Sequence, residues 1–134
     1  MQKRSVEVIF WLLIGCAVLL AGCVAPGGPT GALAGQVSIG PLSPVVREGE
    51  SEPTPAPEVF AERQVVIYRA SGRSEVARAP IGPDGSYRVD LPAGRYVVDI
   101  NHLGMDQAKG LPAPVDIVAG QTTRLDIAID TGIR

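Results

Sequence analysis

The feature that most constrains the fold of this chain is an alternation of apolar and polar residues in short runs. In the clearest run, Tyr87, Val89 and Leu91 alternate with polar residues. A period of two places one face of a β-strand on a core and the other face in water. Runs of this kind, or short apolar runs, occupy residues 36–39, 65–68, 74–81, 87–91, 96–100, 115–117 and 125–129. Seven short strands predict an all-β sandwich, because a single sheet would leave its apolar face in water.

Turn residues separate these runs. Residues 82–85 read Gly-Pro-Asp-Gly, and residues 91–95 read Leu-Pro-Ala-Gly-Arg. Proline fixes φ and glycine adopts positive φ, so both segments suit a reversal of the chain. The second segment predicts a hairpin between strands 87–91 and 96–100, with Leu91 opposite Tyr96.

The predicted hairpins also bring opposite charges into register. In the first, Arg88 faces Asp99 on the wet face of the sheet; in a second hairpin, which turns at Gly120, Asp116 faces Arg124. Cross-strand ion pairs on an exposed face are worth about 0.2–1 kcal/mol each. A slip of one residue would turn the apolar face to water, so the charge pattern and the apolar pattern predict the same pairing.

The N-terminus has the order of a secretory signal. Lys3 and Arg4 precede residues 8–24, which contain no charge, and the run closes with Leu20-Ala21-Gly22-Cys23. This ending resembles the bacterial lipoprotein box. The resemblance implies a signal peptide over residues 1–22 and a mature chain that begins at Cys23, with diacylglycerol on the sulfur and a fatty-acyl chain such as palmitate on the amine. Two or more such chains anchor a protein stably in a membrane.

An uncleaved transmembrane anchor is the alternative, since about 18 apolar residues span a bilayer. In either case the domain lies outside the cytoplasm and is tied to a membrane. Residues 23–34 are rich in glycine and proline and predict a flexible tether, with the folded domain over residues 35–134. Val24 stands where an aspartate retains some lipoproteins in the inner membrane, which favours the outer membrane or the cell surface.

Composition excludes several classes of function. The chain has a formal net charge of −2, and without residues 1–22 it keeps 10 basic and 13 acidic side chains, so we expect no nucleic-acid partner. It contains one His and two Cys, of which Cys16 leaves with the signal peptide. Zinc fingers and a disulfide framework are therefore excluded, and we expect no cofactor and no metal.

One string of residues resembles a known family. Asp84-Gly85-Ser86-Tyr87-Arg88-Val89, followed by residues 91–96 (Leu-Pro-Ala-Gly-Arg-Tyr), is similar to the signature of carboxypeptidase regulatory-like domains. These domains have the seven-stranded Greek-key sandwich called transthyretin-like or prealbumin-like. The resemblance covers residues 35–134. It implies an accessory or interaction module without catalytic activity, and it identifies no ligand.

Residues 40–63 depart from a minimal sandwich. They hold five prolines and five glutamates, which predicts an extended, partly polyproline excursion between strands. It is either a recognition segment for a partner protein or a solvated loop. Phe60 and Val46 are its expected contacts with the body of the domain.

The second departure is the segment 101–114, which contains His102, Leu103, Met105 and Asp106. These four residues and Phe60 are the candidate interaction residues. A metal site made by Asp99, Asn101, His102 and Asp106 is the alternative, but hard cations prefer more carboxylates than this. The simpler expectation is a crossover loop in which Leu103 or Met105 packs on the edge of the core.

These observations predict a membrane-anchored, extracytoplasmic lipoprotein that acts as a non-catalytic binding or scaffolding module. Its expected partners are membrane lipid, through acylated Cys23, and an envelope protein or peptide that binds loop 40–63, loop 101–114 or an exposed strand edge. The alternative is a sandwich face that binds carbohydrate, which would need exposed aromatic side chains. A small transthyretin-like hydrolase is a remote alternative, because those enzymes use several histidines and a Tyr-Arg-Gly-Ser terminus, and this chain has one His and ends in residues 130–134, Asp-Thr-Gly-Ile-Arg.

Overall fold

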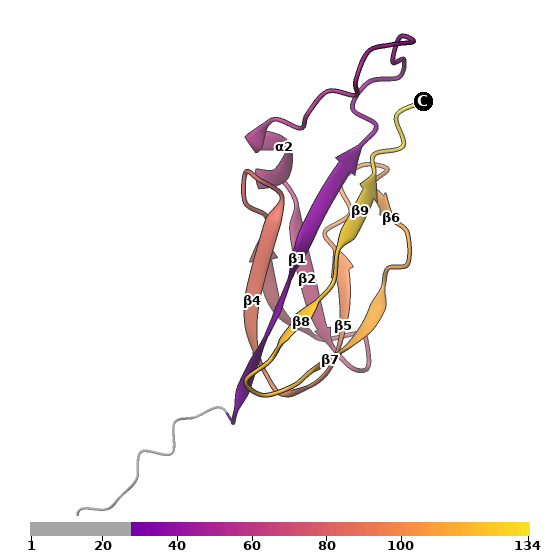
Figure 1. The fold of residues 1–134 in the computed structure, drawn as a ribbon. Helices are drawn as coiled ribbons and strands as arrows, with labels where there is room; N and C mark the ends of the chain where they lie inside the picture. The colour runs from indigo at the N-terminus through magenta and orange to yellow at the C-terminus, as the bar shows by residue number, and fades with distance from the viewer. Residues whose placement is uncertain (1–27) are drawn as a thin grey trace, which may run out of the picture.

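Two β-sheets stacked face to face form the body of the protein (Figure 1). The computed structural model describes residues 28–134, so the predictions for the signal peptide 1–22, for Cys23 and for the first part of the tether lie outside the described residues. The elements are β1 (Thr30–Gly40), α2 (Pro57–Ala61), β2 (Gln64–Arg69), β3 (Glu75–Pro80), β4 (Ser86–Pro92), β5 (Gly94–Ile100), β6 (Gln107–Ala108), β7 (Ala113–Ile117), β8 (Thr122–Arg124) and β9 (Ile127–Asp130).

The sheets differ in composition and strand direction. One has the order β4-β1-β9-β6, with β8 also paired to β1; the other has the order β3-β2-β5-β7. Strand β1 is antiparallel to β4 and parallel to β8 and β9. The all-β sandwich prediction is confirmed. The strand expected over residues 125–129 is present as β9, which begins at Ile127, and the short strands β6 and β8 are additions.

Alternation along the strands builds the core between the sheets. Tyr96, Val98 and Ile100 of β5 are buried, as are Tyr87 and Leu91 of β4, which confirms their predicted inward orientation. Full burial of one large apolar side chain stabilises a fold by roughly 1.5–3 kcal/mol. The largest side chains that lose nearly all contact with solvent are Leu33, Val65, Val66, Ile67, Leu91 and Val98.

The predicted start of the domain at residue 35 is wrong. Strand β1 begins at Thr30, and its first half, residues 30–34, was expected to be tether. Its small residues resemble a linker, but they are required for close packing. A Cβ atom on Gly31 would lie 2.2 Å from the carbonyl oxygen of Val118, and one on Gly35 would lie 1.9 Å from that of Leu125.

The predicted pairing of strands 87–91 and 96–100 is also wrong, because β4 and β5 belong to different sheets. Leu91 pairs with Gly31 of β1, and Tyr96 pairs with Val115 of β7. The chain crosses from one sheet to the other after β4. A period of two determines which face a residue takes, and the same residues face the core in either arrangement.

The two predicted cross-strand ion pairs are therefore absent from the described residues. Arg88 lies 3.7 Å from Asp90 of its own strand and does not pair with Asp99. Asp116 binds the guanidinium of Arg95 on β5 at 2.8 Å, as the pairing of β5 with β7 requires. Arg124, the predicted partner of Asp116, lies on β8 in the other sheet and binds Asp126 at 3.1 Å.

Candidate interaction surface

The molecule is elongated along β1, whose 11 residues span about 35 Å. The described chain enters at one tip of this strand, and residues 41–56 project beyond its other tip, near the C-terminus (Figure 1). We call this second end the distal pole and define it as residues 41–56, 101–106 and 131–134.

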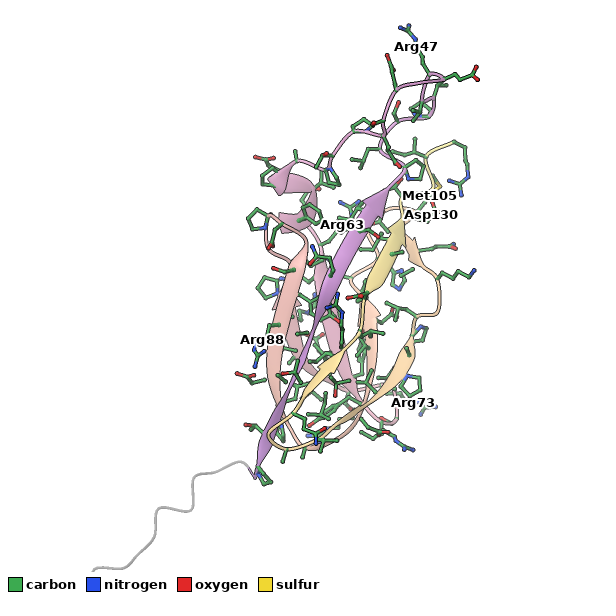
Figure 2. The ribbon with its side chains drawn as sticks, in the orientation of Figure 1. Arg47, Arg63, Arg73, Arg88, Met105 and Asp130 are labelled. Atoms are coloured by element: carbon green, nitrogen blue, oxygen red, sulfur yellow. The ribbon has the colours of Figure 1, made fainter. Side chains whose placement is uncertain are left out.

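Direct contacts hold the three segments of the distal pole together. The amide of Thr131 donates to the carbonyl oxygen of Gly40 at 3.1 Å, and its hydroxyl donates to that of Pro41. A Cβ atom on Gly132 would lie 3.1 Å from Cβ of Met105, so the C-terminal segment packs on loop 101–106. Figure 2 shows Met105 beside Asp130 at this end, with Arg47 farther out on the projecting segment.

Exposed apolar side chains gather at the distal pole. Four of the six large exposed hydrophobic residues in the described part of the chain lie there: Val45 (73 % exposed), Val46 (43 %), Met105 (69 %) and Ile133 (37 %). Single exposed apolar residues are ordinary, so it is the placement of four of them at one end that makes this end the candidate interaction surface. The expectation that Val46 would pack on the body is therefore wrong. Of the two alternatives for the loop, Leu103 is half-buried and Met105 is exposed.

The projecting segment adds negative charge to this surface. Residues 41–56 carry three exposed glutamates, Glu48, Glu50 and Glu52, and one basic residue, Arg47. The carboxylate of Glu52 also lies against the end of β1, because a Cβ atom on Gly40 would be 2.7 Å from its Oε1. The projecting segment thus combines apolar side chains with an excess of carboxylates, while Arg134 adds a positive charge at the C-terminal segment of the same pole.

Phe60 anchors the return of the Pro-rich segment. It belongs to the short helix α2, which has Pro57 in its first turn, and its ring is buried in the core. The neighbouring Val59 is partly buried against the same cluster. The expectation that Phe60 contacts the body is confirmed, and its ring is not available to a partner.

Asp106 is not an exposed interaction residue. It is 5 % exposed and forms a two-pronged ion pair with Arg63, with Nε–Oδ2 at 2.7 Å and Nη2–Oδ1 at 3.1 Å. The guanidinium also donates to the carbonyl oxygen of Val59 at 2.8 Å. Sequence reasoning missed Arg63, because 43 residues separate it from Asp106. This pair ties the loop after β5 to the end of α2.

His102 bridges the same loop to strand β5. Its Nδ1 lies 3.0 Å from the carbonyl oxygen of Asp106, and its Nε2 lies 3.0 Å from Oδ1 of Asp99. The hydrogen bond to the carbonyl oxygen of Asp106 raises the pKa of His102 above its ordinary value; burial opposes this, and the hydrogen bond and charge of the Asp99 carboxylate raise the pKa further. Both ring nitrogens face oxygen acceptors, so the charged imidazolium fits the site best.

The four residues proposed for a metal site have other partners. Asn101 accepts a hydrogen bond from the amide of Gln64 at 2.9 Å and donates one to the carbonyl oxygen of Glu62 at 3.1 Å. Asp106 faces Arg63, and Asp99 faces His102. Within residues 28–134, no three His, Cys, Asp or Glu side chains are grouped to hold a metal ion. The open hollow beside this loop, of about 430 Å³, is lined by His102, Met105 and Leu111 among others.

The aromatic side chains do not form an exposed platform in the described part of the chain. Phe60, Tyr87 and Tyr96 are buried, and Tyr68 is half-buried. Binding of sugar rings to a sandwich face by stacking would use two or more exposed rings. The surface between residues 28 and 134 therefore gives the carbohydrate alternative no stacking site.

Residues 84–96, which resemble the carboxypeptidase regulatory-like signature, have structural roles. Gly85 turns with φ +81°, its carbonyl oxygen accepts the amide of Val37 at 2.8 Å, and a Cβ atom there would lie 2.5 Å from the Val37 carbonyl oxygen. The hydroxyl of Tyr87 donates to the carbonyl oxygen of Leu125 at 2.5 Å, and burial raises the pKa of this phenol. The hydroxyl of Tyr96 donates to that of Pro92 at 2.7 Å. These residues close turns and satisfy buried polar atoms.

Comparisons with known proteins identify solved structures that have a similar fold. No protein-family model matches the chain, and no curated protein matches it. Among solved structures, it is similar to the minor pilin GBS52 of Streptococcus agalactiae, with a TM-score of 0.52 and 17 % identity over 77 % of this chain and 45 % of that one. It is also similar to the TIE protein of Bacillus anthracis, with a TM-score of 0.53 and 15 % identity over 77 % of this chain and 17 % of that one.

A third similar structure is a DUF3823 family protein from Parabacteroides merdae, with a TM-score of 0.46 and 15 % identity over 76 % of this chain and 46 % of that one. This chain therefore spans less than half the length of each of the three. At these identities the likeness to the minor pilin and to the TIE protein establishes the β-sandwich fold alone. No helix within residues 28–134 is long and apolar enough to cross a bilayer.

Proposed function

We propose that this chain is an extracytoplasmic, non-catalytic binding module that is tethered to a membrane through acylated Cys23 and binds an envelope protein or peptide with its distal pole. The observation that carries the proposal is the position of the exposed apolar residues. Four of the six large exposed hydrophobic residues in the described chain lie at the end of the molecule opposite to the point where Thr30 enters β1.

The length of the chain supports this arrangement. Six residues separate Cys23 from Thr30, and the seven steps between the two Cα atoms reach at most about 25 Å. Strand β1 adds about 35 Å from Thr30 to Gly40. When the long axis of the domain is perpendicular to the membrane, the distal pole is therefore the part farthest from the lipid surface and faces neighbouring envelope components.

The chemistry of the distal pole defines the kind of partner. Val45, Val46 and Met105 offer apolar contacts, and Glu48 and Glu50 add carboxylates beside them. A complementary surface is an apolar patch flanked by lysine or arginine, since opposite charges around an apolar centre favour specific association. The partner is therefore an envelope protein or peptide with such a basic, apolar patch.

The similar structures are compatible with this proposal. One is a minor pilin by its description, and its β-sandwich has the fold of this chain. The string at residues 84–96 favours a distant relationship to the carboxypeptidase regulatory-like domains, in which the sandwich is an accessory or interaction module. The likeness to the minor pilin and the resemblance of residues 84–96 both favour a binding role without catalysis.

Site-specific photo-cross-linking in the native host tests the proposal. A photo-reactive amino acid at Met105 is expected to give an adduct with one envelope protein. The same probe at Val118, an exposed apolar residue outside the distal pole, serves as the matched control. The Met105 adduct should fall at least fivefold when Val46→Asp is added. Equal adducts from both positions, or none from Met105, would overturn the proposal.

A further inference from the structure

Strand β4 forms one edge of the five-stranded sheet and pairs only with β1 among the described elements (Figure 1). The amide of Ala32 donates to the carbonyl oxygen of Gln121 at 2.9 Å, away from β4. Ala32 is opposite Asp90, so this pair is not hydrogen-bonded and Asp90 directs its own N–H and C=O outward. Arg88 is opposite Ala34 in the same register, so its N–H and C=O also point away from β1.

The open edge is short, because both of its ends are already satisfied. The amide of Ser86 donates to Oδ1 of Asp84 at 3.1 Å, and the carbonyl oxygen of Ser86 accepts the amide of Gly82 at 2.8 Å. At the other end, Pro92 has no N–H, and its carbonyl oxygen accepts the hydroxyl of Tyr96 at 2.7 Å. Four backbone groups remain unpaired within the described chain, two on Arg88 and two on Asp90.

The other sheet edges carry features that prevent pairing with another strand. Strand β7 contains Pro114 and follows Pro112, so two successive outward positions lack an N–H group. Strand β3 ends in Pro80, and its pairing with β2 is interrupted by a bulge. Strand β6 has two residues and β8, which pairs only with β1 among the described elements, has three. Strand β4 has no proline before Pro92 and pairs with β1 without a register shift.

The charges on the β4 edge of one copy are complementary to those on the β4 edge of a second, antiparallel copy. When two copies pair antiparallel about Val89, Arg88 of each lies opposite Asp90 of the other, and the outward backbone groups of both residues form hydrogen bonds. Centring the pair on Arg88 or on Asp90 would instead set like charges opposite each other, which is unfavourable. The side chains of Arg88 and Asp90 are 61 % and 72 % exposed, and their mutual contact at 3.7 Å is loose.

We propose that β4 is a self-association edge, through which a second copy of this chain pairs antiparallel and joins the two five-stranded sheets. The contact is small, so the association is weak and depends on a high local concentration of the chain. The antiparallel arrangement points the two Thr30 ends in opposite directions. Copies whose long axes are perpendicular to their membranes therefore pair when they are anchored in two membrane surfaces that face each other. The edge uses no residue of the distal pole, so it stands apart from the proposed function.

Disulfide trapping tests the register in the purified full-length chain, kept in detergent and carrying Cys16→Ser and Cys23→Ser, so that the introduced cysteine is its one thiol. Antiparallel residues that are not hydrogen-bonded bring their Cβ atoms within reach of a disulfide. Mild oxidation of Val89→Cys is expected to give at least fivefold more linked homodimer than Val97→Cys, a half-buried valine on the central strand β5. Equal yields would overturn the proposal. A link from position 89 to a different protein would overturn the assignment of a second copy.

Charge exchange in the Val89→Cys background tests complementarity. Arg88→Asp places two aspartates on the edge, and Asp90→Arg places two arginines there, so each variant alone is expected to lose at least fivefold in dimer yield. An equal mixture of the two should recover the yield as a mixed dimer, because their edges then carry opposite charges. Misfolded chains would not recover on mixing. Failure of the mixture to recover, with both variants retaining the circular dichroism of the parent, would overturn the proposal.

Discussion

Arg63 and Asp106 form a nearly buried, two-pronged ion pair that joins the end of α2 to the loop after β5. Their side chains are 12 % and 4 % exposed, and Nε lies 2.7 Å from Oδ2. Replacement of one partner of such a pair leaves an uncompensated charge in a region with little water. This contact therefore holds loop 101–106, and with it Met105, in place beside the C-terminal segment.

Asp106→Ala is expected to lower the free energy of unfolding by about 3–5 kcal/mol, because it strands the guanidinium of Arg63. Chemical denaturation followed by circular dichroism measures the loss. Glu75→Ala, which breaks the solvent-exposed pair of Glu75 with Arg78, is the matched control and should change stability little. Similar effects of the two substitutions would contradict the structural role of the buried pair.

His102 makes stability depend on pH. Its pKa is raised in the folded chain, so its contribution is fully present below the pKa of the unfolded chain and is lost as the pH rises through the folded value. The groups that face it are the carboxylate of Asp99 and the carbonyl of Asp106, with Arg63 beyond. The difference in melting temperature between the parent and His102→Gln should be larger at about pH 5 than at about pH 8.

Because the chain contains one histidine, a single imidazole resonance reports its titration by NMR. Asp99→Asn should lower the midpoint of this titration, since it removes the neighbouring carboxylate. A midpoint that is at or below that of the unfolded chain would contradict the geometry around His102.

Gly35→Ala is expected to destabilise the sandwich by at least about 1–3 kcal/mol, the usual cost of overpacking. The new Cβ atom would lie 1.9 Å from the carbonyl oxygen of Leu125, so β1 and the segment between β8 and β9 must separate. Thermal unfolding measures the change. Gly28→Ala is the control, since no atom lies within 4 Å of its added Cβ. Tolerance of Gly35→Ala would show that this close approach is not needed.

Cys23→Ala is expected to move the protein from the membrane fraction to the soluble fraction, because it removes the sulfur that carries the diacylglycerol. Fractionation of the native host followed by immunoblotting measures the distribution. Cys16→Ala is the control and should leave the protein with the membrane. Continued membrane association of Cys23→Ala would contradict lipidation as the tether.

The apolar alternation was sufficient to predict an all-β sandwich and to orient Tyr96, Val98 and Ile100 toward the core, because side-chain direction in a strand is local. Phe60 could also be predicted as a body contact, since a large aromatic residue in a polar segment gains by burial. The amino-acid sequence determined these features through short-range geometry and the cost of leaving apolar surface in water.

Only the tertiary structure decided which strands pair, where the domain begins and what Asp106 binds. Strands 87–91 and 96–100 are neighbours in sequence but lie in different sheets, and the same inward faces are compatible with both arrangements. The partner of Asp106 is 43 residues away in the chain. Contacts of this range arise from the docking of complete elements, which no local pattern of residues encodes.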